Sequence, residues 1–304
     1  CPAGAHGFAE PSSTIPKGSV EHWDGTAGGL DVYVTAPQAQ PQPNQAAALV
    51  VVPDVFGFDS GHHRWICDRL SDRLQCSVVC PDFFRGCPIA SEKLVSGICS
   101  ALCGGHLCRM LSGVKKHRWT TGARSGGCCG GCCGGGKSST GRKGPGVGED
   151  QGEDCQLKID FEDTIVSTLK ATLGADVRIG CLGFCWGGWM VTHAASLPSV
   201  CAVAACHPSP DKLCKLLGED FEEVCKGVSC PVLMCPAKDD GAGVKTGGLM
   251  DKVVNGHGAV AIAVSSGKDT GTGSGENPLL GDVGGRATFL EFPRMNHGWV
   301  TRGP

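Results

Sequence analysis

No stretch of this 304-residue chain is apolar for long enough to cross a membrane, and no hydrophobic leader precedes the first predicted strand. The 21 cysteines do not form the spaced disulfide framework of a small secreted protein. Many of them lie within apolar, strand-like runs, where cysteine packs as a small core residue. These absences predict a protein of a reducing, cytoplasmic compartment that has no membrane partner.

Acidic residues are absent from 93–148, a segment that carries nine lysines or arginines. The whole chain has a net charge of −3 and this segment +9, which leaves −12 for the remainder. Apart from Trp119 the segment also lacks aromatic side chains, which single-stranded nucleic acids use as stacking platforms. We therefore expect a solvated, poorly ordered basic insert and no nucleic-acid partner. A second glycine-rich stretch, 256–286, also lacks hydrophobic periodicity, and both are expected to interrupt a single domain spanning 1–304.

Outside these inserts, strand-like and helix-like patterns alternate along the chain. Residues 1–29 are rich in glycine, proline and serine and are expected to form a loop, and 30–34 alternates like an early edge strand. Continuous apolar runs are typical of strands buried on both faces of a parallel sheet. Alternation of such runs with helical segments predicts an α/β fold with a mostly parallel, doubly wound sheet. The runs are 47–52, 77–80, 177–184, 200–206, 231–235 and 287–292.

Two helices are predicted in some detail. The first should be capped by Asp59 or Ser60 and should turn four apolar residues inward, namely Trp65, Ile66, Leu70 and Leu74. The second should place apolar residues on one face at every fourth position and should end at Gly174, a typical C-terminal cap. Its apolar residues are Leu157, Phe161, Ile165, Leu169 and Leu173.

The segment 177–190, VRIGCLGFCWGGWM, has the pattern of a nucleophile elbow. A buried strand runs directly into Cys185, and a helix-compatible segment follows. Gly183 and Gly187 lack a Cβ atom, which allows the close approach of strand and helix that this turn requires. The G-x-C-x-G pattern also occurs around four cysteines of the basic insert, but only Cys185 has a strand before it and a helix after it. A structural role for Cys185 as a small buried residue is the alternative.

Polar residues at the ends of later strands complete a catalytic set. Asp240 follows one strand and His297 follows the last, which gives the chain order nucleophile, acid, histidine that is typical of α/β hydrolases. Such a set needs a base that reaches the thiol and a carboxylate that fixes the imidazole tautomer. The backbone N–H groups of Trp186 and Val55 are the predicted oxyanion hole.

Six motifs in series resemble the dienelactone hydrolase family, also called carboxymethylenebutenolidases. The resemblance implies an α/β-hydrolase fold without a large cap domain and hydrolysis of a lactone or related ester through a Cys185–His297–Asp240 triad. It also favours Asp240 over Asp239, because the family places its acid three residues after the position of Ala237. The motifs are PDVFGF (53–58), PDFFRG (81–86), GFCWGG (183–188), CHPSP (206–210), AKDD (237–240) and MNHGW (295–299).

This chain departs from the family pattern at several positions. Bacterial members have a glutamate where this chain has Asp54, whose shorter side chain is a candidate for tuning the nucleophile. The family's substrate-binding arginine would fall within 93–148, and the closing helix that follows the family histidine has little sequence here. Arg302 is a candidate for contacting a substrate carboxylate, with simple solvation as the alternative. His207 is expected either to line the pocket or to be structural.

Other signals in the sequence are weaker. The segment 131–138, GCCGGGKS, matches a P-loop expression but lacks the flanking strand and helix that a nucleotide site needs. The cysteines near it lack the second well-placed pair of a zinc site, so no metal or cofactor is predicted. These cysteines are Cys128, Cys129, Cys132 and Cys133, with Cys103, His106 and Cys108 upstream. The histidines on predicted helices, His62, His63 and His193, are expected to be surface or core residues.

The sequence thus predicts a cysteine-dependent hydrolase whose only predicted partner is a small lactone or ester. Two other hypotheses remain open at this point. One is a non-catalytic relative that binds a small molecule in the same fold. The other is a basic, cysteine-rich binding protein that acts through the insert 93–148. The natural substrate and the oligomeric state are not predicted.

Overall fold

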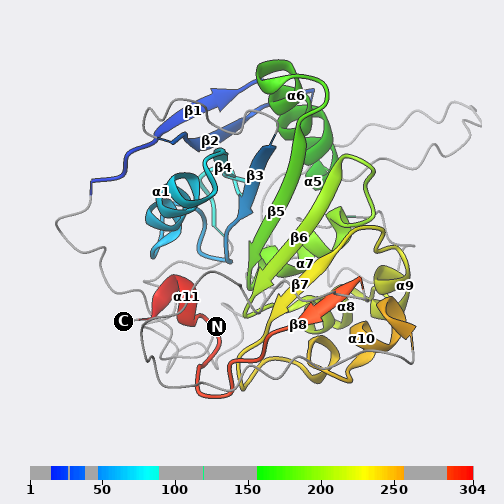
Figure 1. Ribbon diagram of the computed structural model, residues 1–304. Coiled ribbons are helices and arrows are strands. Elements are labelled where there is room, and N and C mark those ends of the chain that lie inside the picture. The colour runs from blue at the N-terminus through cyan, green and yellow to red at the C-terminus, as the bar shows by residue number, and fades with distance from the viewer. Residues whose placement is uncertain are drawn as a thin grey trace, which may run out of the picture.

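A computed structural model describes residues 15–26, 28–37, 47–88, 119, 156–256 and 286–303. Its centre is an eight-stranded sheet in the order β1-β2-β4-β3-β5-β6-β7-β8 (Figure 1). β1 and β2 pair antiparallel, β2 pairs antiparallel with β4, and every other neighbouring pair is parallel. The strands are β1 (Ser19–Trp23), β2 (Leu30–Thr35), β3 (Ala47–Val52), β4 (Ser77–Pro81), β5 (Arg178–Phe184), β6 (Val200–Cys206), β7 (Val232–Cys235) and β8 (Ala287–Phe289).

Helices cover both faces of this sheet, as the doubly wound prediction requires (Figure 1). One face packs on α1 (His63–Leu74), with Val300 of α11 (Trp299–Arg302) at its margin. The other face packs on the remaining helices that contribute to the main core. These are α5 (Gln156–Ile159), the π-helical segment η1 (Asp160–Val166), α6 (Ser167–Leu173), α7 (Trp186–Ala194), α8 (Pro210–Leu217), α9 (Phe221–Lys226), the short 3₁₀ turn η2 (Ala242–Val244) and α10 (Leu249–Val254).

The apolar run of β3 explains why the sheet must be covered twice. Val50 and Val52 belong to the core cluster on one face, whereas Val51 belongs to the cluster on the other. Successive side chains of a strand point to opposite faces, so an uninterrupted valine run can be buried only between two helical layers. All three valines are fully buried.

The N-terminal strands differ from the sequence prediction. Ser19–Trp23 forms the edge strand β1, although 1–29 was expected to be loop. The 30–34 segment is therefore an inner strand, β2, flanked by β1 and β4. β1 buries little apolar surface, and its strand character arises from pairing with β2, which the pattern of its own side chains does not reveal.

The prediction for α1 was partly wrong. The helix begins at His63 after His62, whose side chain makes no capping hydrogen bond, so neither Asp59 nor Ser60 is the cap. Ile66 is buried as predicted, but Trp65 is 39% and Leu74 50% exposed. The inward face carries small and polar side chains instead, because Asp68 and Ser71 hydrogen-bond to Tyr33 and to the Cys76 carbonyl.

The second predicted helix is present but contains the π-helical segment η1. Its apolar residues recur every four positions, a period that lies between the 3.6 residues of an α-helical turn and the wider π-helical turn. The π segment therefore keeps them on one face, and all but Leu173 are buried. Gly174 ends the helix with φ 107, as predicted. Within η1, Asp160 forms a bidentate ion pair with Arg85.

Trp119 is the one described residue of the basic insert, and it is buried, with 4% of its surface exposed. Its ring packs on Phe161 and stacks on His193. At this position the prediction of a solvated insert is wrong, because a large apolar ring gains from covering the core. The P-loop match, the clustered cysteines of the insert and the second insert lie outside the described residues. Within the described parts of the chain, no helix has the length and apolar content that a membrane span requires.

Candidate active site

Cys185 occupies a sharp turn between β5 and α7. Its backbone has φ 54 and ψ −108, a combination that side-chain-bearing residues rarely adopt. Strain of this kind is retained only where the surrounding structure enforces it, and it is common at functional sites. The predicted strand–turn–helix geometry is thus present, with the thiol at the first turn of a nine-residue helix.

Glycines allow this turn to close. A Cβ atom on Gly183 would lie 2.2 Å from the carbonyl oxygen of Gly187, and one on Gly187 would lie 2.2 Å from that of Val52. Both distances are far below any real Cβ contact, so no larger residue fits at either position without backbone movement. β5, the start of α7 and the end of β3 therefore meet at Cys185.

The structure brings His297 and Asp240 to this turn from two other segments. The Nδ1 atom of His297 lies 2.5 Å from Oδ1 of Asp240, and the other carboxylate oxygen accepts the Ala237 N–H at 2.7 Å. The neighbouring Asp239 accepts the backbone N–H of His297 at 2.7 Å. Asp240 thus contacts the imidazole ring, whereas Asp239 binds the main chain of His297, and the catalytic role of Asp240 stays a prediction.

The sulfur of Cys185 is hydrogen-bonded to His297, and both residues are almost fully buried. Burial by itself would raise the pKa of the Cys185 thiol, but the adjacent His297 charge and hydrogen bond outweigh it and lower that pKa to about 5. Burial likewise opposes charge on His297, while Cys185 and Asp240 raise its pKa to about 10. Together these pKa shifts favour a thiolate–imidazolium pair at neutral pH.

The loop after β3 lies against the first turn of α7. Val52 is in register with Gly183, and a Cβ on Gly187 would come within 2.8 Å of the Pro53 carbonyl oxygen. Val55 follows in this loop, and Trp186 is the first residue of α7. The structure thus brings the two predicted oxyanion-hole segments together beside Cys185. Their role in binding an oxyanion stays a prediction.

Asp54 and Arg302 form a buried ion pair with each other. Arg302 Nε lies 3.0 Å and Nη2 3.2 Å from the two Asp54 oxygens, and Thr301 adds a hydroxyl bond to Asp54 at 3.1 Å. Arg302 is only 2% exposed and lies over the Phe56 ring at 4.0 Å, so the solvated alternative is wrong. Losing one partner of such a pair typically costs about 3–5 kcal/mol of stability. The pair ties α11 to the loop after β3.

His207 lies directly against the ring of His297. The two ring centroids are 4.9 Å apart at an interplanar angle of 70°, and His207 is fully buried. Within the described residues neither ring nitrogen of His207 has a hydrogen-bond partner. Burial and the nearby His297 charge lower its pKa to about 4, so this ring is neutral at physiological pH.

The other predicted histidines lie away from Cys185 or have structural partners, as expected. His63 accepts the Asp54 N–H at 3.3 Å and faces the Ser60 carbonyl through Nδ1, which fixes its neutral tautomer. Burial lowers the pKa of His63. His62 reaches the Gly303 carbonyl at 3.3 Å. His193 lies at the far end of α7, where it contacts Glu219, a residue that the sequence analysis did not single out. No spacing rule would have found that contact.

Comparisons with known proteins show the family to which this chain is similar. The model of the family described as "Dienelactone hydrolase family" matches residues 30–261, a range that includes Cys185 and Asp240 and ends before His297. An uncharacterized AIM2 family protein of Schizosaccharomyces pombe (strain 972 / ATCC 24843) is 38% identical over 80 residues. That match covers 26% of this chain and 28% of the fission-yeast protein.

Solved structures agree on the fold. The putative dienelactone hydrolase of Klebsiella pneumoniae has a TM-score of 0.52 at 16% identity, covering 93% of this chain and 87% of its own. An acylaminoacyl peptidase of Pyrococcus horikoshii has a TM-score of 0.50 at 12% identity, covering 96% of this chain and 39% of its own. Likeness at these identities establishes the fold alone, whereas the family model covers most of the sequence. The chain has the α/β-hydrolase fold and belongs to the dienelactone hydrolase family.

Proposed function

We propose that this protein hydrolyses a lactone or a small carboxylic ester, with Cys185 as nucleophile, His297 as general acid and base, and Asp240 as the orienting acid. The observation that carries the proposal is the convergence of these three side chains at a strained strand–helix turn. Membership of a hydrolase family agrees with this chemistry. The lowered thiol pKa supplies the reactive form without a separate activation step.

In the first half of the reaction, the Cys185 thiolate attacks the substrate carbonyl carbon. The carbonyl oxygen becomes negatively charged and is held by the N–H groups of Trp186 and Val55. When the intermediate collapses, the C–O bond to the alcohol breaks, and His297 donates its proton to the leaving alkoxide. For a lactone the alcohol stays attached to the acyl group. The product is a thioester on Cys185.

In the second half, the now neutral His297 takes a proton from water, and the resulting hydroxide equivalent attacks the thioester. Cys185 leaves as thiolate, the carboxylic acid is released, and the thiolate–imidazolium pair is restored. Asp240 holds the His297 Nδ1–H throughout and stabilises the charged imidazole. His207 is positioned to contact water or substrate beside His297, because its two nitrogens lack partners among the described residues.

The ion pair that Arg302 forms with Asp54 indicates which substrate charge the site prefers. Its guanidinium is already matched by Asp54 in a buried pair, so the pair contributes little net positive charge to the site. We propose that uncharged esters and lactones are turned over at least as well as analogues that carry a carboxylate. Arg302 then anchors α11 to the loop after β3 and does not bind a substrate carboxylate.

A panel of aryl esters and lactones tests the proposal, with turnover measured at neutral pH and the acyl-enzyme trapped by rapid acidification. We expect turnover and an acyl group on the peptide that contains Cys185. The matched control is Cys87→Ala, which removes an exposed cysteine and should leave both unchanged. Saturable binding of a panel member without turnover would instead favour a non-catalytic binder. Undiminished turnover without an acyl group on Cys185 would refute the mechanism.

A further inference from the structure

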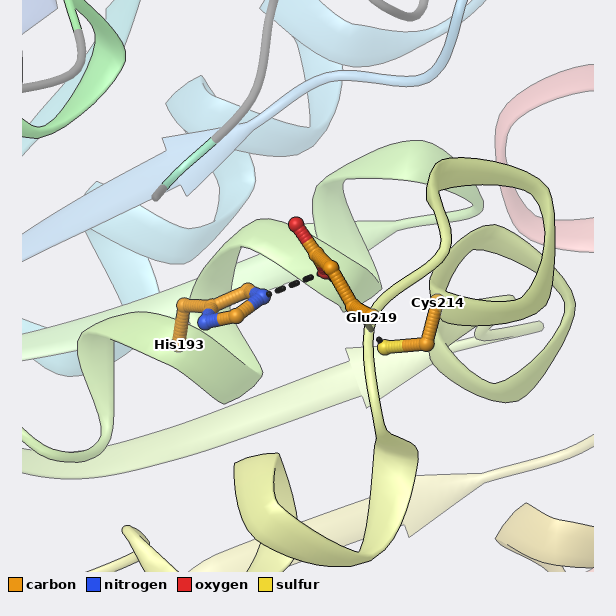
Figure 2. A group of neighbouring side chains, drawn as sticks. All are labelled: His193, Cys214 and Glu219. Carbon is orange, nitrogen blue, oxygen red and sulfur yellow. Dashed lines mark hydrogen bonds and ion pairs between the residues drawn. The ribbon is translucent and has the colours of Figure 1, made fainter. Parts of the chain in front are cut away.

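A second group of cysteine, histidine and carboxylate lies at the opposite end of α7. Figure 2 shows Glu219 between His193 and Cys214. His193 comes from the last turn of α7, Cys214 from α8, and Glu219 from the segment between α8 and α9. Their ligand atoms all lie within 4.8 Å of one another. None of these residues takes part in the reaction proposed for Cys185.

The separations of these atoms fit a tetrahedral metal site. Ligands at zinc distances of 2.0 to 2.3 Å are about 3.3–3.8 Å apart in a tetrahedron. Here His193 Nε2 lies 3.1 Å from Glu219 Oε2, and Cys214 Sγ lies 3.6 Å from the same oxygen. Two of the three edges are therefore already close to the required length.

The backbone fixes Glu219 beside Cys214. Gly218 ends α8 with φ 72, a left-handed conformation that favours glycine, and the chain turns back there. The backbone N–H of Glu219 then donates to the Cys214 carbonyl at 2.8 Å. The His193 ring is held between Trp119, which stacks at 5.8 Å, and the edge of Trp189 at 4.9 Å. All three side chains are thus positioned before any ion arrives.

The two carboxylate oxygens of Glu219 differ in their hydrogen bonding, and this difference indicates a bound ligand. Oε2 interacts with Trp189 Nε1 at 2.9 Å as well as with His193 and Cys214. Oε1 is buried and has no hydrogen-bond partner among the described residues, and the side chain as a whole is only 8% exposed. Leaving a buried carboxylate oxygen unsatisfied is costly, and a cation bound to this carboxylate would relieve that cost.

We propose that His193, Cys214 and Glu219 bind one zinc ion that links α7 to α8 and the segment after it. Nitrogen, sulfur and oxygen donors together suit zinc, and water completes the tetrahedron. The Trp189 N–H bond to Glu219 is the outer contact that such carboxylate ligands usually have. The ion has a structural role, because it lies at the end of α7 away from Cys185.

The test uses the full chain in the Cys185→Ala background, which removes the competing thiolate, with a phosphine reductant to keep thiols reduced. Zinc is titrated by calorimetry, and thermal unfolding is followed with and without zinc. We expect one zinc site that raises Tm by about 5 °C at a hundredfold excess over its Kd. Adding Cys214→Ser or Glu219→Gln should weaken that site at least 100-fold and remove the Tm shift.

The matched control is Cys225→Ser, which removes another buried thiol of the same region and should keep the site. Because any zinc bound by the cysteines of the basic insert is common to all variants, the difference between Cys214→Ser and Cys225→Ser isolates the proposed ligand. With cobalt in place of zinc, the thiolate charge-transfer band should be weaker in Cys214→Ser and in Glu219→Gln than in Cys225→Ser. Equal metal binding and equal Tm shifts in Cys225→Ser, Cys214→Ser and Glu219→Gln would overturn the proposal. Glu219→Gln keeps the side-chain shape, so its comparison with Cys225→Ser still tests the proposal if Cys214→Ser fails to fold.

Discussion

The two ends of α7 carry the same three kinds of side chain in different orders. At its start, His297 lies between Cys185 and Asp240, whereas at its end Glu219 lies between Cys214 and His193. In the first group the thiol faces an imidazolium, and its pKa is lowered to about 5 although burial opposes this. In the second, burial and the adjacent Glu219 charge both raise the pKa of the Cys214 thiol. The order of the three side chains, and not their composition, therefore sets the direction in which the thiol pKa shifts.

The helix itself reinforces this difference. The N-terminal end of a helix favours negative charge and its C-terminal end favours positive charge, each by about 0.3–1 kcal/mol at accessible sites. Cys185 precedes the first residue of α7 and His193 lies in its last turn. The dipole thus assists a thiolate at the Cys185 end of α7 and gives no such help to Cys214.

The largest effect should come from removing the nucleophile. Cys185→Ala should lower kcat/KM for any ester that the wild type cleaves by about 10⁴-fold or more, because no other group replaces the thiolate. Cys225→Ala, which removes a buried thiol of α9, should stay within about twofold. Initial rates on an aryl ester compare the two variants. Retention of activity in Cys185→Ala would remove the distinction between the cysteines.

The carboxylates beside His297 should differ in their effects. Asp240→Asn should reduce kcat/KM by about 10³-fold, because an amide at this position favours the wrong imidazole tautomer. Asp239→Asn keeps an acceptor for the His297 backbone N–H and should cost about tenfold at most. The same ester assay measures both. If Asp239→Asn were the more damaging, the assignment of the orienting acid would have to be reversed.

Thiol reactivity tests the electrostatic part of the comparison. In the wild type, alkylation of Cys185 should stay fast at neutral pH and should slow as the pH falls through about 5, where the lowered thiol pKa lies. In His297→Gln the imidazolium is gone and burial remains, so the pKa should rise to 9 or above. At pH 7 the labelling rate should then drop about 100-fold. Peptide mapping with iodoacetamide follows this, and in both proteins Cys214 should label slowly.

The smallest effect should follow from His207, whose ring lies beside His297. His207→Phe keeps an aromatic ring and removes two buried nitrogens that have no hydrogen-bond partner among the described residues, so the free energy of unfolding should rise by about 1 kcal/mol. If these nitrogens hold water or substrate, kcat/KM should fall by about tenfold. Urea unfolding and the ester assay give the two numbers. A variant that is more stable and fully active would make His207 purely structural.

Much of the fold was predictable because the inner strands and the elbow are local patterns. The β3 run, the β5–Cys185–α7 segment and the Gly174 cap were read directly from apolar runs and glycines. Strand β1 was missed because its side chains are mostly exposed, and only backbone pairing with β2 makes it a strand. Trp65 was predicted to face inward because it is apolar, but its side chain is exposed. Asp68, a polar residue bonded to Tyr33, lies on the inner face of α1, and apolar character alone does not predict this.

The candidate site was predictable to a similar extent. Motif order selected Cys185, Asp240 and His297, and the structure brings the three into contact. The pairing of Asp54 with Arg302 joins positions 248 residues apart, so nothing local indicates it. The same holds for Trp119, whose surroundings in the sequence predict solvent rather than core.

The sequence by itself determined the inner strands and the elbow and selected the proposed triad, because each depends on neighbouring residues or on short motifs, and the elbow also needs glycine's freedom from a Cβ atom. Tertiary structure alone decided which charge faces which thiol. Cys185 and Cys214 are chemically identical, and their opposite tendencies arise from the segment that folds against each: an imidazole at one end of α7 and a carboxylate at the other. Electrostatic effects act through space over a few ångströms, and those distances exist only once the chain has folded.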